Sequence, residues 1–330
     1  VSAEPTPTVG SGLVEFGARV RFRHPLARSA AYRSASAQQI QEAHAALAEA
    51  TDPAADPDRR AWHRAQAAAG PDEDVAAELE QSAGRAQDRG GVAAAAAFLE
   101  RAALLTPDPE HRAQRLLTAV RAKRDAGDLD TALGLLVAAE AGPLVPLQTA
   151  EVESLRGQIA SYQGRDSDAA RLLLRAARFF EPLDVALARE TYLEAIYAAM
   201  FAGDPGRERE AAGAARAAPP APDPPRAVDV VLDALALRLT EGHAAAAPAL
   251  TRALSLLVSL DADVGEARRS LWSAGGRPGA IIAMELWDFE SWHALAARQV
   301  QVARDMGALA QLQFTLARLG LYNVLAGQLA

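Results

Sequence analysis

Apolar residues recur along this chain at steps of three and four, and the stretch from 126 to 143 shows the pattern most clearly. There the small and aliphatic residues that share one helix face are Ala132, Leu135, Leu136 and Ala139. A Gly127-Asp128 turn opens the stretch. Gly142-Pro143 ends it, because glycine supplies a left-handed cap and proline cannot continue the helix. The pattern predicts a tight turn followed by one packed helix.

The same pattern returns at nearly even spacing. The turn glycines are 36, 37, 39 and 39 residues apart, at Gly91, Gly127, Gly164, Gly203 and Gly242. An alanine stands five places after each except the fourth, where Glu208 makes that unit the weakest. Each unit is predicted to be a helix, a glycine turn and a second helix. Since one pair cannot bury its apolar face alone, the pairs are expected to stack into a solenoid. The alternative is an alanine-rich helical domain without repeats.

The start of the chain is different. Residues 1–12 are rich in Pro, Ser and Gly and predict a flexible lead-in. Residues 13–23 alternate apolar and polar side chains around Gly17-Ala18, which predicts a β-hairpin that needs a helix to pack on. Ser36 followed by Gln39 is a capping box that starts a helix. We therefore divide the chain into residues 1–34 and a helical region, 35–330, which we expect to be truncated at both ends.

Two later segments depart from the repeat. Residues 217–226 are too rich in proline for a helix and predict a surface loop. Residues 275–279 (GGRPG) predict a second break, after which a helical period returns from Ser291. Gly307, Gly320 and Gly327 predict one more helix pair, which begins and is then cut short.

Composition narrows the function classes. Apolar residues make up 50% of the 330 residues but aromatic residues only 5%, so the helices are expected to pack closely through small side chains. The net charge of −8 argues against direct nucleic-acid binding. No cysteine is present, which removes disulfides, thiolate nucleophiles and cysteine-based zinc sites. Without an apolar run of about 18 residues or a signal-peptide pattern, we expect a soluble cytoplasmic protein with no membrane contact.

Catalytic chemistry has no candidate in the sequence. The histidines show no metal-type spacing, at His24, His44, His63, His111, His243 and His293. There is no nucleophile elbow and no G-x4-G-K-[ST] phosphate loop. We therefore expect no catalytic residue, no metal and no cofactor in this chain, and we do not expect an enzyme.

Aromatic residues supply the candidate binding site. Three of the four tryptophans fall between positions 272 and 292, in a group made of Trp272, Met284, Trp287, Phe289 and Trp292. Three tyrosines are candidates for a concave face: Tyr162, Tyr192 and Tyr197. Both sets have two interpretations. One is core packing between alanine-rich helices, and the other is a pocket or groove for an inducer or a partner peptide.

Two family resemblances bear on these expectations. Gly-x4-Ala with a further alanine seven residues on resembles the second helix of the tetratricopeptide repeat, although the period here is longer. The segments RFRHPLARSAAY (21–32), HAALAEATDPAADPDRRAWHRAQAAAGPDEDVAAELEQSA (44–83) and AAAFLERAALLTPDP (95–109) form an extended match to a second family. With EPLDVALARETYLEA (181–195) and WHALAARQVQVARDMGAL (292–309), they resemble the middle of the large ATP-binding, MalT-like regulators of the LuxR family of actinobacteria.

The resemblance implies a parent protein with an N-terminal signal-transduction ATPase, a winged helix, a tetratricopeptide-like region and a DNA-binding helix-turn-helix. It makes residues 13–34 a winged-helix remnant, and it assigns ATP/ADP and DNA binding to the parent. His24 matches a winged-helix histidine that contacts the nucleotide phosphate in related ATPases; alternatively it caps the following helix. The expected function is a sensor and protein-interaction region for an effector or partner. The alternative is a protein–protein scaffold or oligomerisation module without a small ligand, an interpretation that includes self-association.

Overall fold

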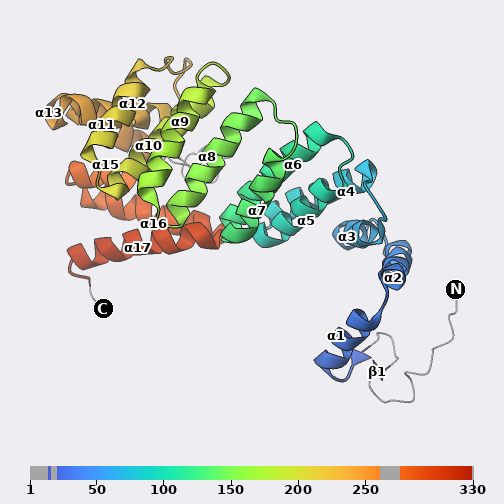
Figure 1. Ribbon diagram of the computed structural model, residues 1–330. Helices are drawn as coiled ribbons and strands as arrows, with labels where there is room; N and C mark the ends of the chain where they lie inside the picture. The colour runs from blue at the N-terminus through green and yellow to red at the C-terminus, as the bar shows by residue number, and fades with distance from the viewer. Residues whose placement is uncertain (1–13, 16–20, 261–275, 329–330) are drawn as a thin grey trace.

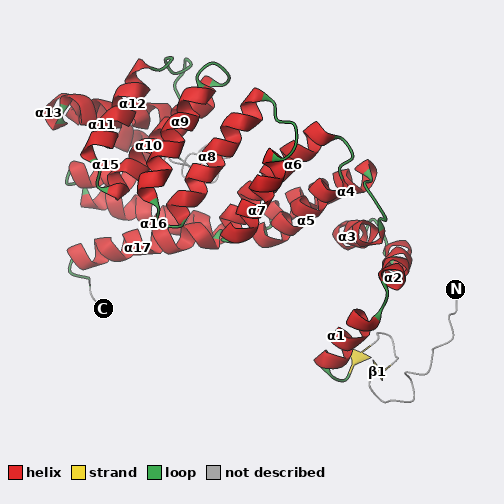
Figure 2. Cartoon of the chain, viewed as in Figure 1, coloured by secondary structure: helices red, strands yellow, loops and turns green. Residues whose placement is uncertain are grey.

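The computed structural model describes residues 14–15, 21–260 and 276–328. Helices dominate this part of the chain, as Figure 2 shows. Strands Val14–Glu15 (β1) and Arg21–Phe22 (β2) form an antiparallel pair with Val14 opposite Phe22. The predicted all-α fold with a short N-terminal β-hairpin is confirmed.

Short connections join most of the helices that follow one another in the described ranges. Those before the first glycine turn are α1 (Pro25–Ser34), α2 (Ala37–Ala50), α3 (Pro57–Ala67) and α4 (Glu73–Asp88). Those of the middle region are α5 (Val92–Leu105), α6 (Pro109–Ala126), α7 (Leu129–Glu140), α8 (Pro146–Tyr162), α9 (Asp166–Phe180) and α10 (Val185–Ala202). The remainder are α11 (Pro205–Ala217), α12 (Ala227–Glu241), α13 (His243–Ser259), α15 (Gly276–Glu285), α16 (Phe289–Asp305) and α17 (Leu309–Leu325).

Helices α2 to α13 pack mainly on their neighbours in sequence, and Figure 1 shows α4 to α13 as a curved row of helices. This order of packing is compatible with the expected solenoid. Helix α1 contacts β2 and buries none of its residues, and in Figure 1 it stands apart from the row. The division of the chain at residue 34 stays a prediction.

The predicted glycine turns join the helices of five hairpins, from α4–α5 to α12–α13. Gly127, Gly164, Gly203 and Gly242 have positive φ, which glycine adopts at little steric cost. In the first hairpin the positive φ belongs to Gly90, one residue before the predicted position, while Gly91 is the N-cap of α5. Glycine therefore recurs at this spacing in the sequence because each turn needs a residue with positive φ.

Polar caps start many of these helices. The predicted capping box forms at Ser36, whose hydroxyl accepts from the Gln39 N–H. Asp128 and Asp204 follow their turn glycines and accept from backbone N–H groups three residues on. These two turns therefore end one helix and start the next within two residues.

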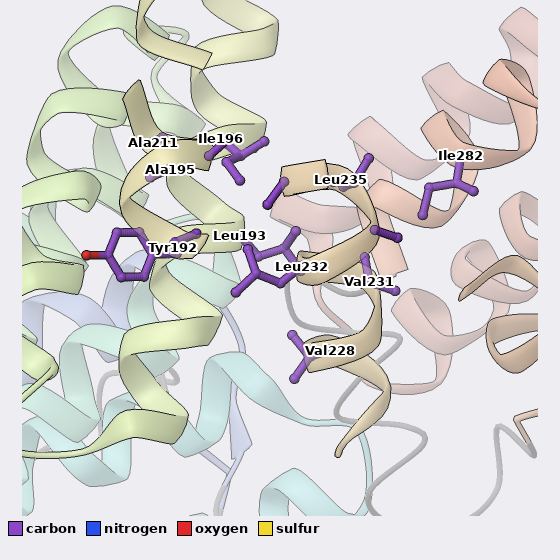
Figure 3. Packing of buried hydrophobic residues seen from close by; sticks show 14 of the residues in the cluster. Tyr192, Leu193, Ala195, Ile196, Ala211, Val228, Val231, Leu232, Leu235 and Ile282 are labelled. Carbon is purple, nitrogen blue, oxygen red and sulfur yellow. The ribbon is translucent and has the colours of Figure 1, made fainter. Parts of the chain in front are cut away.

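Small side chains let the helices pack closely, as expected. The largest cluster of buried residues joins α9 to α13 with α15 and α16, and Figure 3 shows Leu193 of α10 beside Leu232 of α12. In the middle of α8, a Cβ at Gly157 would lie 2.7 Å from the Leu173 Cγ. Only glycine lets α9 approach α8 this closely.

Three details differ from expectation. Of the break predicted at 275–279, Gly275 lies outside the described residues, and residues 276–279 form the first turn of α15, a place where proline is tolerated. The unit with Glu208 forms a complete hairpin, because Glu208 lies on the first turn of α11 and Ala211 and Ala215 are buried instead. The pair around Gly307 is complete as well, since α16 and α17 both have 17 residues. The loop predicted at 217–226 lies between α11 and α12.

Helix α17 returns to the row of hairpins, a contact that the repeat does not predict. In Figure 1 it lies across the ends of several earlier helices, and its N-terminal part packs against α6. Gly307 and Gly90 meet so closely that a Cβ on Gly307 would overlap the Gly90 carbonyl oxygen. Farther along α17, Gln311 Nε2 donates to the Tyr162 hydroxyl and Arg318 Nη1 donates to the Tyr197 hydroxyl at 3.0 Å. The chain thus joins segments more than 100 residues apart.

Candidate functional site between α6, α8, α10 and α17

A cavity of about 230 Å³ lies where α17 meets the earlier helices. Its apolar lining comes from α8, α9 and α10: Leu155, Leu173, Phe180 and Leu187. The polar and aromatic residues that line it are more numerous: Arg121, Arg124, Glu151, Ser154, Gln158, Ser161, Tyr162, Glu190, Thr191, Glu194, Tyr197 and Gln311. An apolar floor with several converging polar groups is typical of a small-molecule site.

Charged residues of both signs line the cavity, and Glu151 of α8 pairs there with Arg121 of α6 at 2.9 Å. Helix α6 also supplies Arg124, and α10 supplies Glu190 and Glu194. Helix α8 connects them, since Gln158 accepts from Arg124 Nη1 and donates from Nε2 to Glu194 at 2.7 Å. Arg124 also donates from Nε to the Asp125 carboxylate at 2.9 Å. Burial lowers the Arg124 pKa, but the charges of Asp125, Tyr162 and Glu194 and a hydrogen bond outweigh it and hold the pKa above its ordinary value.

Glu190 connects the cavity to a buried ion network between α10 and α12. Burial raises its pKa above the ordinary value, although an N–H of Arg226 donates to it and opposes the shift. Arg226 also pairs with Asp229, and Arg189 donates to the same Asp229 carboxylate at 2.7 Å. Arg189 and Asp229 have side chains only 3% and 0% exposed. Burial pushes the Asp229 pKa up, but these hydrogen bonds outweigh it and hold the pKa below its ordinary value.

Two of the three predicted tyrosines line this cavity. The hydroxyls of Tyr162 and Tyr197 accept the bonds from α17 described above, and Tyr162 packs edge-on against Phe314. Tyr192 lies elsewhere: it is fully buried in the core and its hydroxyl donates to Glu181. Burial, the bond to Glu181 and the Glu181 charge raise its pKa. Its place fits the core-packing interpretation.

The tryptophan group does not line the cavity. Trp292 is 2% exposed and packs against Phe289 and Tyr322, in agreement with core packing. Trp287 is 78% exposed and has φ of 55°, so it occupies the turn between α15 and α16 where other hairpins have glycine. Phe289 and Met284 are partly exposed beside it. Trp272 lies outside the described residues.

The histidines have local roles. His24 is the N-cap of α1, with its Nδ1 accepting from the Leu26 N–H at 3.1 Å, as the alternative interpretation proposed. His44 and His63 bring their Nδ1 atoms to 2.9 Å between α2 and α3. Burial lowers the pKa of both rings, and the neighbouring His44 lowers that of His63 further. Throughout the described ranges, three or more His, Cys, Asp or Glu side chains never gather in a way that would hold a metal ion.

The sequence interpretation missed the charged wall of the cavity. The sequence does contain one indication of this wall: α10 is otherwise mostly apolar, and its charged residues are Arg189, Glu190 and Glu194. Their neighbours across the cavity come from segments far away in the chain, which periodicity does not identify. In the described part of the chain, no helix is both long and apolar enough to cross a membrane. Comparison with known protein families and with curated proteins gives no match to this chain.

Proposed function

We propose that this chain is the sensor and protein-interaction region of a LuxR-family, ATP-dependent transcriptional regulator. The resemblance of its extended segments to that family supports the class of protein. The cavity beneath α17 is the observation that carries the sensor role, because it combines a buried apolar floor with converging charged and aromatic groups. ATP and DNA binding are proposed for other parts of the parent protein, with His24 as the one residue of this chain proposed to contact the nucleotide there.

The proposed mechanism is a shift between two arrangements of α17. A ligand in the cavity contacts α10 and α17 together, so it favours the arrangement in which Gln311 and Arg318 bond to Tyr162 and Tyr197. A ligand shifts an equilibrium only through different affinities for its two states. The arrangement of α17 then biases the ATPase of the parent between its open and closed states.

Thermal unfolding of the 330-residue chain with a panel of metabolites tests the proposal. A true ligand raises the melting temperature with the concentration dependence of native-state binding. Ser161→Phe fills the cavity and is expected to abolish the shift, whereas Ser255→Phe, on the exposed face of α13, leaves it unchanged. A panel without any cavity-dependent shift would contradict the sensor role.

A scaffold or oligomerisation module is the second candidate, favoured by exposed aliphatic side chains on α17. They include Leu309, Leu316, Leu321, Val324 and Leu325. Apolar side chains gathered on one exposed helix favour association. Light scattering of the same samples should then show a mass that rises with concentration and falls in Leu321→Asp.

A further inference from the structure

Two carboxylates of α10 face the cavity together. Glu190 and Glu194 are one helical turn apart, a spacing that places them on the same face of the helix. Thr191 lines the cavity from the same turn, and Tyr197 continues this wall toward the end of α10. One small group in the cavity can therefore contact both carboxylates.

Of these two carboxylates, Glu194 has the weaker compensation of its negative charge by nearby cations. Within the described residues it forms no ion pair, and its hydrogen bond comes from the neutral amide of Gln158. Arg124 acts on it only at longer range, because the Arg124 side chain bonds to Asp125 and Gln158. Glu190 shares its one cation, Arg226, with Asp229. A partly buried carboxylate without a direct cation is stabilised by a positively charged partner.

Aromatic rings border the same space. Tyr162 comes from α8 and Tyr197 from α10, and both line the cavity. The face of an aromatic ring attracts ammonium groups through its quadrupole. On the α6 wall, Arg121 pairs with Glu151 and Arg124 pairs with Asp125, so both guanidinium groups are already partly neutralised, and an anionic group of the ligand would share them with these carboxylates.

We propose that the cavity binds a small molecule through a primary ammonium group, with Glu194 as the counter-ion and Glu190 as a second acceptor. The proposal rests on the sensor function and names the chemical class of its ligand. Simple amines and α-amino acids share the ammonium group, and they differ in whether a carboxylate reaches Arg121 and Arg124.

Calorimetric titration of the full chain with n-butylammonium chloride tests the class, with norvaline as the amino-acid probe and n-butanol as the neutral probe. We expect saturable binding of one or both charged probes and none of butanol at the same concentration and ionic strength. Tighter binding of norvaline would assign the ligand to the amino acids, and tighter binding of butylammonium to the simple amines.

Glu194→Gln keeps the shape of the side chain and the bond from Gln158 but removes the charge. It should weaken binding of the charged probes by about tenfold or more, since bonds to charged groups contribute that much. Glu210→Gln, an exposed carboxylate paired with Arg178, is the matched control and should leave binding unchanged. Circular dichroism checks that both variants fold.

Equal binding by the wild type and Glu194→Gln, or no binding of either charged probe, would overturn the proposal. The sensor function would survive that result if another metabolite shifted the melting temperature of the wild type but not of Ser161→Phe. Both proposals would fall if no compound gave a cavity-dependent shift.

Discussion

Two kinds of glycine turn join the helices of this chain, and they differ in what lies beyond the turn. At Gly164 and Gly203 a Cβ would meet no heavy atom within 4 Å, so the positive φ alone favours glycine there. At Gly90 and Gly307 the φ is also positive, but each glycine additionally faces the backbone of the other turn. The first kind only joins the helices of a hairpin, and the second also packs the α16–α17 turn against the α4–α5 turn.

This difference separates local from long-range determinants of the fold. A hairpin turn needs a glycine, a cap and two amphipathic helices, all contained in fewer than 40 residues. The contact of Gly90 with Gly307 needs every hairpin between them to stack with the right curvature. Substitutions at the two kinds of turn are therefore expected to have different costs.

The largest effect is expected for Gly307→Ala. The new Cβ combines left-handed strain with an overlap on the Gly90 carbonyl, so the free energy of unfolding should fall by about 3 kcal/mol or more, with α17 released. Gly203→Ala adds only the strain and should cost about 1 kcal/mol. Urea unfolding measures both, and limited proteolysis detects a released α17. Similar costs for the two variants would contradict the difference between the turns.

A smaller effect is expected from the polar contacts that close the cavity. Gln311→Ala removes the donor to the Tyr162 hydroxyl and should lower the free energy of unfolding by about 1 kcal/mol. Gln301→Ala is the control, since Gln301 bonds to Asp305 on the exposed side of α16. Its cost should stay below about 0.5 kcal/mol. Hydrogen exchange on α17 should accelerate only in Gln311→Ala.

Trp287 gives the converse test, because it holds a turn position where other hairpins have glycine. Trp287→Gly relieves the positive φ but makes the unfolded chain more flexible, so stability should stay equal or rise by up to about 1 kcal/mol. Thermal unfolding measures this change. A loss of more than about 1 kcal/mol would mean that the exposed indole stabilises the fold.

The smallest effect is expected from pH at the His44–His63 pair, remote from α17 in the chain. Both pKa values are lowered in the fold, so the unfolded state takes up protons first as pH falls below about 6.5. The stability that depends on this pair is therefore fully present above that pH and is lost as the pH falls below it. His44→Gln should flatten this part of the curve of melting temperature against pH. An unchanged slope would exclude the pair as its source.

The sequence predicted the features that depend on a few neighbouring residues. The hairpin at 13–23, the capping box at Ser36 and the glycine turns are local, and each follows from backbone geometry or hydrogen bonding. The turn at Gly90 was misplaced by one residue because two glycines stand together. The turn at Trp287 was missed because tryptophan seldom adopts positive φ.

The cavity was beyond prediction because its walls come from distant segments. Tyr162 and Tyr197 were chosen as aromatic residues of a concave face, and they do line it, whereas Tyr192 and Trp292 are buried in the core. Glu194 joins them from α10, the helix that also holds Tyr197, whereas Gln311 joins them only because α17 returns across the hairpins. No period in the sequence encodes that return.

The return of α17 is tested most directly by a cross-link. The chain has no cysteine of its own, so any disulfide within it must join the two cysteines that are introduced. A Cβ at Gly127 would lie 3.8 Å from the Ala310 Cβ, within the range that a disulfide spans. The account predicts that Gly127→Cys with Ala310→Cys forms an intramolecular disulfide under mild oxidation, detected by mass and gel mobility. Gly203→Cys with Ala310→Cys should not form one, since no Ala310 atom lies within 4 Å of a Cβ there. Equal cross-linking of the two pairs, or none of the first, would contradict the closure of the cavity by α17.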